Sequence, residues 1–293
     1  MADERGGRLG GAMEIVDGLE FWKMSGSGND FILIDDRRGS MTSEGWSHIA
    51  ERTCRRGASV GADGMIVVQA SQSADFSWIF LNADGSEAEM CGNGARCVAR
   101  FAFLKGFAGE SLCFSGRVGI INARVMGSSV RVDMPDPTGP RPEAGLTVDG
   151  GAFMVNDMDT GVPHAVVFVS STDAMDVESI GQQIRWNERY APKGTNVDFV
   201  EVMGGNLIRL RTFERGVEAE TLACGTGAVA AALVSASKDL TKLPSEVETR
   251  SGEKLTVDAG GRNGGRYERV TLEGGTRVAY VGRLHAESFA ASQ

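Results

Sequence analysis

The sequence contains no long apolar run. None of its apolar stretches reaches the roughly 18 residues that a membrane-spanning helix requires, so we expect no membrane partner. Residues 1–18 carry acids, arginines and glycines but no apolar core, which argues against a secretory signal and predicts a disordered leader. A chain without an anchor or an export signal is expected in the cytoplasm.

Cysteine and histidine are few and scattered. The chain has five cysteines, three histidines and no C-x-x-C pair, which is not the pattern of a disulfide scaffold. Cys91 and Cys97 would be separated by about 600° of rotation on a helix, so they point to different faces and do not form half of a zinc site. We therefore expect no metal. Cys54, Cys97 and Cys113 are expected to be small buried apolar residues.

Basic residues are in deficit. The chain has 30 Lys and Arg against 39 Asp and Glu, a formal net charge of −9, which argues against nucleic acid as a partner because phosphate binding depends on clustered basic residues. With 42% hydrophobic and 24% charged residues, the composition is that of an ordinary folded protein. A length of 293 residues exceeds the usual domain size of roughly 100–200 residues and predicts two domains.

The order of apolar runs divides the chain into two similar series of strands and helices. Residues 134–145 are rich in proline and are the expected linker. We expect an N-terminal half over residues 19–135, to which a closing strand at 277–285 returns. The C-terminal half is expected over residues 136–276.

Two pairs of similar segments suggest an internal duplication. The pattern C-G-x-G-A occurs at Cys91 and again at Cys224, each time before an apolar run with helical spacing. In the same order, GNDFILID near Asn29 is similar to GTNVDFVEV near Asn196. Two such pairs predict two related halves, each with a helix that begins at a cysteine.

A cysteine at a helix start combines a base with an anion site. The N-terminus of a helix has unpaired backbone N–H groups and a partial positive charge, so it attracts carboxylates and phosphates. The same field lowers the pKa of a thiol from about 8.5 toward neutrality. Glycine after the cysteine lets a ligand approach the backbone closely.

Two such starts predict proton transfer at a carbon next to a carboxylate. One cysteine, as a thiolate, removes the α-proton of an amino acid, and the other, as a thiol, returns a proton to the opposite face. The helix starts stabilise the charge that develops on the carboxylate. The scheme inverts the α-carbon without pyridoxal phosphate, so we expect no cofactor and a small amino acid as substrate.

Two other classes of protein remain as alternatives. A Gly-x-Gly helix start can hold a nucleotide phosphate, but the Lys-Ser/Thr of a Walker motif is absent here. A non-catalytic protein that binds amino acids or anions could use the same helix starts. Binding alone would be satisfied by serine or threonine, however, and does not need two thiols.

Six segments together resemble the diaminopimelate epimerase family, over roughly residues 20–283. They are GSGNDFILID, RRGASVGADG, NADGSEAEMCGNGARC, GVPHAVV, GTNVDFVEV and ERGVEAETLACGTGA. The C-G-x-G-A pair alone would indicate the wider group of cofactor-independent racemases, which includes proline racemase. The resemblance implies an epimerase that interconverts LL- and meso-diaminopimelate for lysine and peptidoglycan synthesis, with a homodimer as a possible assembly.

The resemblance also assigns roles to individual residues. It implies that Cys91 and Cys224 are the acid–base pair and that His164 positions a catalytic group. Backbone donors to the reacting carboxylate match Gly92, Asn93, Gly225 and Thr226. Residues that contact the amino and carboxylate groups of the substrate match Asn29, Asn82, Asn196, Glu214 and Arg215, of which Arg215 suits the distal carboxylate.

The implied fold is α/β (α+β), with two pseudo-symmetric halves, each a curved mixed β-sheet around a central helix, and an active site in the cleft between them. The chain departs from the family pattern at two places that concern the distal group. Val162 stands where many members have asparagine, and ERGVEAETLACG is one residue longer than the common form. A related racemase for proline, hydroxyproline or glutamate is therefore the alternative function.

Overall fold

The computed structural model describes residues 17–88, 90–148 and 151–289. Of the expected leader, residues 1–16 lie outside the described residues. Asp17 and Gly18 are held in place, because Gly18 N–H donates to the carbonyl of Leu284 at 2.7 Å and Asp17 accepts from the N–H of Ala286 at 2.8 Å. No helix among the described residues is long and apolar enough to cross a membrane.

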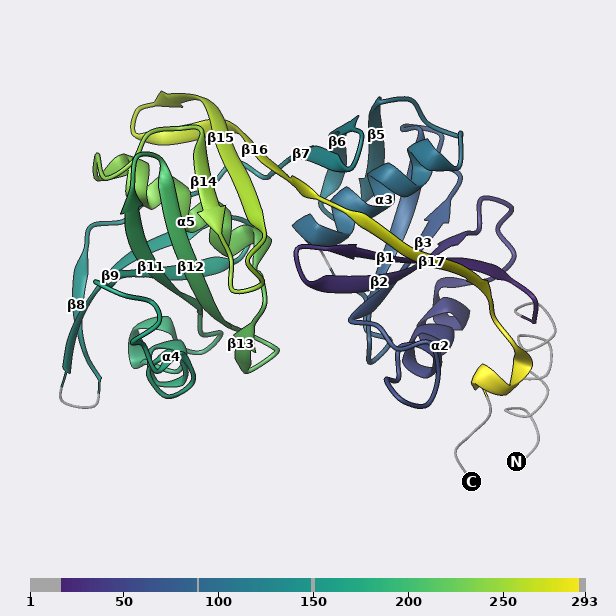
Figure 1. The fold of residues 1–293 in the computed structure, drawn as a ribbon, viewed down its shortest axis with the longest axis horizontal. Helices are drawn as coiled ribbons and strands as arrows, with labels where there is room; N and C mark the ends of the chain where they lie inside the picture. Colours follow the sequence, from purple (N-terminus) through teal and green to yellow (C-terminus); the bar gives the residue numbers. More distant parts are fainter. Residues whose placement is uncertain (1–16, 89, 149–150, 290–293) are drawn as a thin grey trace. The chain divides into compact units, whose positions relative to one another are not determined.

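The chain divides into two compact units (Figure 1). Unit 1 ends at Val130 and resumes at Thr276, and unit 2 is Arg131–Gly275. The boundary therefore falls within β7 (Ser129–Asp133), before the proline-rich segment 134–145 that was expected to be the linker. This segment belongs to unit 2, where Thr138 forms a β-bridge with Asp159.

Over its described residues, unit 1 is a mixed sheet with two α-helices. In chain order it contains β1 (Glu20–Gly26), β2 (Asn29–Asp35), α2 (Ser43–Thr53), β3 (Gly64–Gln69), β4 (Phe76–Asn82), α3 (Gly92–Leu104), β5 (Ser111–Gly116), β6 (Gly119–Met126), β17 (Arg277–Arg283) and the 3₁₀ turn η2 (Ala286–Phe289). The strands pair in the order β17, β1, β2, β3, β4, β5, β6.

Unit 2 has the same kind of composition. It contains β8 (Ala144–Val148), β9 (Gly151–Asp159), β10 (Pro163–Phe168), α4 (Val177–Arg185), the 3₁₀ turn η1 (Glu188–Tyr190), β11 (Asn196–Gly204), β12 (Leu207–Glu214), β13 (Ala219–Thr221), α5 (Gly225–Ser237), β14 (Ser245–Glu248), β15 (Lys254–Asn263) and β16 (Arg266–Gly275). The strands pair in the order β8, β9, β10, β11, β12, β14, β15, β16, and β13 also pairs with β12.

The two units repeat one topology. From β1 to β6 the successive pairs are antiparallel, parallel, antiparallel, parallel and antiparallel. In unit 2 the pairs β9–β10, β10–β11, β11–β12, β12–β14 and β14–β15 follow the same series of directions. In each unit a helix lies within each parallel connection, as such crossovers require. The predicted pseudo-symmetric α+β halves are confirmed.

Each unit has a buried helix that begins after a C-G-x-G-A cysteine. Helices α3 and α5 have 13 residues each, of which ten are buried. Helix α3 packs against β1, β2, β3 and β6, and α5 packs against β9, β10, β11, β12, β14, β15 and β16. The sequence of α5, GTGAVAAALVSAS, is apolar on all sides, which suits a helix enclosed by strands.

The second pair of similar segments is not structurally equivalent. Asn29 begins β2, whereas Asn196 begins β11, which is the counterpart of β3. Phe31 is opposite Gly64 in unit 1 and His164 is opposite Asn196 in unit 2. The counterpart of Asn29, two residues before Phe31, is therefore Val162, two residues before His164. The similarity between the two sequence segments was misleading, because structural equivalence depends on the order of the strands in each unit and not on local sequence.

The predicted burial of the remaining cysteines holds for two of three. Cys54 and Cys97 are buried at 3% and 0% exposure. Cys113 is only half-buried, so this prediction was wrong. Its neighbours in β5, Leu112 and Phe114, take the buried face of the strand, which leaves Cys113 on the opposite face by alternation.

Candidate active site

Both C-G-x-G-A cysteines are the N-cap residues of their helices. Cys91 has extended backbone angles, φ −143° and ψ 114°, and its Sγ accepts from the N–H of Gly94 at 3.3 Å. Cys224 has φ −118° and ψ 113°, and its Sγ accepts from the N–H of Gly227 at 3.4 Å. Each thiol thus takes the place that serine or aspartate usually has at a helix start, beside the N–H groups that can receive an anion.

A buried arginine holds the start of α3 together. The side chain of Arg96 is fully buried, and its Nη1 donates to the carbonyl of Gly92 at 3.1 Å. Its Nη2 donates to Asn93 Oδ1 and to Ser27 Oγ, both at 2.8 Å. Asn93 Nδ2 then donates to Asn29 Oδ1 at 2.6 Å. Two predicted site residues, Asn29 and Asn93, therefore lie in direct contact beside the Cys91 helix start.

A buried acid lies beneath the start of α5. Asp198 of β11 is fully buried and accepts from Thr212 Oγ1 at 2.7 Å. Its other oxygen lies 2.7 Å from His164 Nδ1, and this ring is buried as well. Since a carboxylate accepts, the geometry places the Nδ1 proton between them. The predicted positioning residue His164 is thus held by an acid that the motifs did not reveal, although an aspartate within the apolar strand NVDFV was a signal.

The environment of Cys224 reverses the expected direction of its pKa. Burial raises the pKa of the Cys224 thiol well above its ordinary value, and the negative charges of Glu214 and Asp198 raise it further. Hydrogen bonds from Thr226 and from the N–H of Gly227 act in the opposite direction. The prediction of a lowered pKa at this helix start was wrong, because the field of the helix is smaller than the cost of a buried anion beside two carboxylates.

This raised pKa predicts a pH effect on stability. The Cys224 thiol ionises at about pH 8.5 in the unfolded chain, whereas the folded protein keeps it protonated to higher pH. The contribution of the protonated thiol to the free energy of unfolding is therefore complete below that pH and is lost as the pH rises. We expect the urea midpoint of Cys224→Ala to fall less steeply between about pH 8 and 10 than that of the unmodified protein.

Cys54 provides an internal reference for this measurement. Burial raises its pKa to about 12, so it contributes the same alkaline slope to both proteins and cancels in the comparison. Parallel curves for Cys224→Ala and the unmodified protein would contradict the raised pKa.

Three further predicted residues of unit 2, Asn196, Glu214 and Arg215, lie close together where β10 begins and β12 ends. Asn196 Nδ2 donates to the carbonyl of Pro163 at 3.1 Å, and its Oδ1 accepts from the backbone N–H of Arg215 at 2.8 Å. Asn196 thereby joins the start of β10 to the end of β12, where Glu214 and Arg215 lie half-buried. Thr226 is close to Cys224, with its Oγ1 3.4 Å from the thiol, and its carbonyl accepts from Thr160 Oγ1 at 3.2 Å.

The segment ERGVEAETLACG, which is one residue longer than the common form, spans the hairpin between β12 and β13 and ends at the start of α5. Strand pairing places Glu214 opposite Ala219, so the loop is residues 215–218. Glu218 takes the left-handed conformation, with φ 59°, and accepts from Arg185 at 2.9 Å. The ladder beside the loop is regular, with Thr212, Phe213 and Glu214 opposite Thr221, Glu220 and Ala219.

Asn82 lies at the end of a strand of unit 1, before the turn that follows β4. It ends β4 and is exposed, and its Nδ2 donates to Ser86 Oγ at 3.0 Å within the following turn. The described contacts of this side chain do not link it to Asn29 or Asn93.

The glycine at the third helical position of α5 is expected to be far less replaceable than its counterpart in α3. A Cβ at Gly227 would lie 2.5 Å from Asp198 Oδ1, an atom that is buried and hydrogen-bonded. A Cβ at Gly94 would meet the flexible end of Ile66 at 3.2 Å. We expect Gly227→Ala to lower the free energy of unfolding by about 1–3 kcal/mol through overpacking, and Gly94→Ala to change it little. Equal losses in urea titrations would contradict this difference.

Comparison with known proteins agrees with the family resemblance. The family model described as diaminopimelate epimerase matches residues 21–138 and 157–271. The diaminopimelate epimerase of Aquifex aeolicus is 44% identical over 280 residues, which cover 92% of this chain and 99% of that protein. That of Archaeoglobus fulgidus is 42% identical over 263 residues, which cover 84% and 93%.

Solved structures share the fold at low sequence identity. A PhzF-family phenazine biosynthesis protein from Bacillus anthracis has a TM-score of 0.68 at 15% identity, covering 91% of this chain and 98% of the other. A probable proline racemase from Agrobacterium radiobacter K84 has a TM-score of 0.67 at 14% identity, covering 91% and 92%. At these identities the similarity establishes the architecture only.

Proposed function

Because the chain belongs to the diaminopimelate epimerase family, we propose that it interconverts LL- and meso-diaminopimelate by proton transfer between the α-carbon and the thiols of Cys91 and Cys224. One observation carries this proposal. Each of two topologically equivalent units starts a buried 13-residue helix at a cysteine whose thiol caps the first turn. This symmetry supplies two bases of the same kind, as inversion by two-base proton transfer requires.

In the proposed reaction one cysteine is ionised and the other is protonated when the substrate binds. The thiolate takes the α-proton, and the bonding electron pair moves into the carboxylate, whose oxygens gain charge. The thiol of the second cysteine gives its proton to the opposite face of the carbon, and the thiolate and thiol have then exchanged roles. Both thiols must therefore reach the same α-carbon. The transfer uses only these side chains and no cofactor.

The helix starts are proposed to stabilise the charge on the carboxylate. We propose that the reacting carboxylate binds at the backbone N–H groups of these helix starts, because a fixed donor is worth more as the charge develops. The residues proposed for this role are Gly92, Asn93, Gly225 and Thr226. The side chains proposed to contact the amino and carboxylate groups of the substrate are Asn29, Asn82, Asn196, Glu214 and Arg215. Arg215 is proposed to bind the distal carboxylate and Glu214 the distal ammonium, with His164 as a positioning residue.

We further propose that the protein acts in lysine and peptidoglycan synthesis and that it does so in the cytoplasm. We also propose a homodimer, which light scattering of the purified protein would test. A single-subunit mass would contradict the dimer and would leave the reaction unaffected.

The reaction is tested by proton NMR of LL-diaminopimelate in D₂O under reducing conditions. We expect loss of the α-proton signal and appearance of the meso isomer. Proline, hydroxyproline and glutamate are run alongside, because Val162 replaces a polar residue near the site. If only one of these exchanges its α-proton, the two-thiol chemistry stands and the substrate is wrong. If none exchanges, a binding protein becomes the better interpretation.

A further inference from the structure

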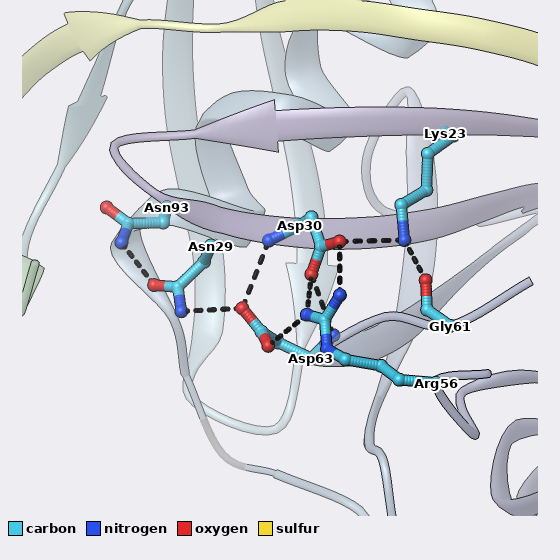
Figure 2. A network of polar contacts seen from close by, with 7 residues as sticks. All are labelled: Lys23, Asn29, Asp30, Arg56, Gly61, Asp63 and Asn93. Atoms are coloured by element: carbon cyan, nitrogen blue, oxygen red, sulfur yellow. Dashed lines mark hydrogen bonds and ion pairs between the residues drawn. The ribbon is translucent and has the colours of Figure 1, made fainter. Parts of the chain in front are cut away.

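A chain of hydrogen bonds runs from the interior of α3 to the loop between α2 and β3. It begins at Arg96 Nη2, which donates to Asn93 Oδ1 at 2.8 Å. Asn93 Nδ2 donates to Asn29 Oδ1 at 2.6 Å, and Asn29 Nδ2 donates to Asp63 Oδ2 at 3.0 Å (Figure 2). At the far end Arg56 donates to Asp63 Oδ1 at 2.7 Å.

The two ends of this chain determine the orientation of both amides. A guanidinium can only donate, so Asn93 must turn its oxygen toward Arg96 and its NH₂ group toward Asn29. An ionised carboxylate can only accept, so Asn29 must turn its NH₂ group toward Asp63. If the amide of Asn29 were reversed, its oxygen would face the oxygen of Asp63 and its nitrogen would face the nitrogen of Asn93. Both contacts would then be repulsive.

We propose that Asp63 and Arg96 are positioning residues that fix the amide of Asn29 as a donor toward the substrate. An NH₂ group has two hydrogens, and the bond to Asp63 uses one of them. The other is offered to the carboxylate beside the Cys91 helix start. This inference rests on the proposed function, because it takes Asn29 to be a substrate contact.

Charged residues around Asp63 hold this end of the hydrogen-bond series in place. Asp63 and Asp30 exchange backbone-to-carboxylate hydrogen bonds of 3.0 and 3.1 Å, and Arg56 donates to both acids (Figure 2). The nearly buried Lys23 lies 2.9 Å from Asp30 and also donates to the carbonyl of Gly61. Burial alone would raise the pKa of Asp30, but Arg56 and Lys23 lower it, so this carboxylate stays ionised.

Unit 2 carries different residue types at the matching positions. Val162 is the counterpart of Asn29, and Thr226 occupies the position in α5 that Asn93 has in α3. A valine side chain can neither donate nor accept. The oriented pair of amides, Asn29 and Asn93, therefore occurs only in the half that contains Cys91 among the described residues. We expect its disruption to weaken binding of the carboxylate rather than to slow proton transfer itself.

The experiment compares three variants by their steady-state kinetics with LL-diaminopimelate. In Asp63→Asn the amide of residue 63 no longer forces Asn29 into one orientation, and we expect the KM to rise about tenfold with kcat changed far less. Asn29→Asp alone should raise the KM at least as much. Glu51→Gln, which removes an exposed carboxylate on α2 of the same unit, is the charge-matched control and should leave both constants unchanged.

The double variant Asn29→Asp/Asp63→Asn separates positioning from support of the fold. It keeps the total charge, and the new carboxylate at position 29 accepts both from Asn93 and from the new amide at position 63. An NH₂ group at position 63 that faces residue 29 no longer accepts from the backbone N–H of Asp30, so the double variant is compared with Asp63→Asn, which carries the same amide. Position 29, however, then has only acceptors. A merely structural role predicts a lower KM for the double variant than for Asp63→Asn, because the bond between residues 29 and 63 is rebuilt. Our proposal predicts a KM at least as high as that of Asp63→Asn, and a lower one would overturn it.

Side-chain amide signals in ¹H–¹⁵N spectra give a readout that does not depend on turnover. Without substrate, Asp63→Asn should shift the signals of both Asn29 and Asn93, because reorientation of one amide changes the partner of the other. Unchanged signals would overturn the proposal even if the KM rises. If the signals shift but the unmodified protein does not epimerise diaminopimelate, the proposed function fails while the control of Asn29 by Asp63 stands.

Discussion

Alanine in place of Cys91 or Cys224 is expected to lower the rate of epimerisation by roughly 10²–10⁴-fold, the usual contribution of a positioned acid or base. Each thiol carries one of the two proton transfers, and alanine can neither take nor give a proton. The remaining machinery, the backbone donors at both helix starts, is retained. The measurement is kcat with LL-diaminopimelate, from the meso isomer that appears by NMR.

The fold should survive both substitutions. Apart from its chemistry, each thiol accepts a weak bond in the first helical turn, at 3.3 Å for Cys91 and 3.4 Å for Cys224, and Cys224 also lies 3.4 Å from Thr226 Oγ1. Loss of an N-cap costs about 1 kcal/mol. Circular dichroism and urea titration check this. Cys113→Ala is the matched control, since Cys113 is a half-buried cysteine of β5 and should retain full activity. Near-normal turnover in either helix-start variant would refute the two-base scheme.

Asp198→Ala is expected to cost about 1–3 kcal/mol of unfolding free energy for each buried donor that it leaves without an acceptor, namely the ring N–H of His164 and the hydroxyl of Thr212. Asp198 is fully buried, and its oxygens hold Thr212 and His164. His164 Nε2 is buried without a hydrogen-bond partner among the described residues, so the ring depends on Asp198 for its orientation. The measurement is equilibrium unfolding in urea.

Asp198→Asn distinguishes the shape of this residue from its charge. An amide at position 198 can still accept from Thr212, and its NH₂ group can donate to the other tautomer of His164, so we expect most of the stability to remain. Burial and Glu214 still raise the pKa of Cys224 in this variant, but the contribution of the Asp198 charge is lost. The thiol should then ionise at a lower pH, as measured by thiolate absorbance after subtraction of the same titration for Cys224→Ala. A loss of stability below about 1 kcal/mol in Asp198→Ala would contradict the role of Asp198 as the buried acceptor for His164 and Thr212.

The two helix starts, the duplication and the family are properties of the sequence. An N-cap contact joins residues three positions apart, Cys91 to Gly94 and Cys224 to Gly227, and such short-range geometry is encoded by neighbouring letters. The apolar run after each cysteine likewise predicts a buried helix. The residues of the motifs are for this reason the ones that could be assigned without a structure.

The environment of each site residue was decided by tertiary structure. His164 and Asp198 are 34 positions apart, and Asn29 and Asn93 are 64 apart, so no local pattern joins them. The helix start at Cys224 predicted a lowered pKa, but burial and two carboxylates raise it. Asn29 and Asn196 have similar surroundings in the sequence but begin strands that are not equivalent. The sequence determines which groups are present and how each helix begins, whereas burial, charge and strand order arise only when distant segments pack, and these set the proton affinity and orientation of the groups.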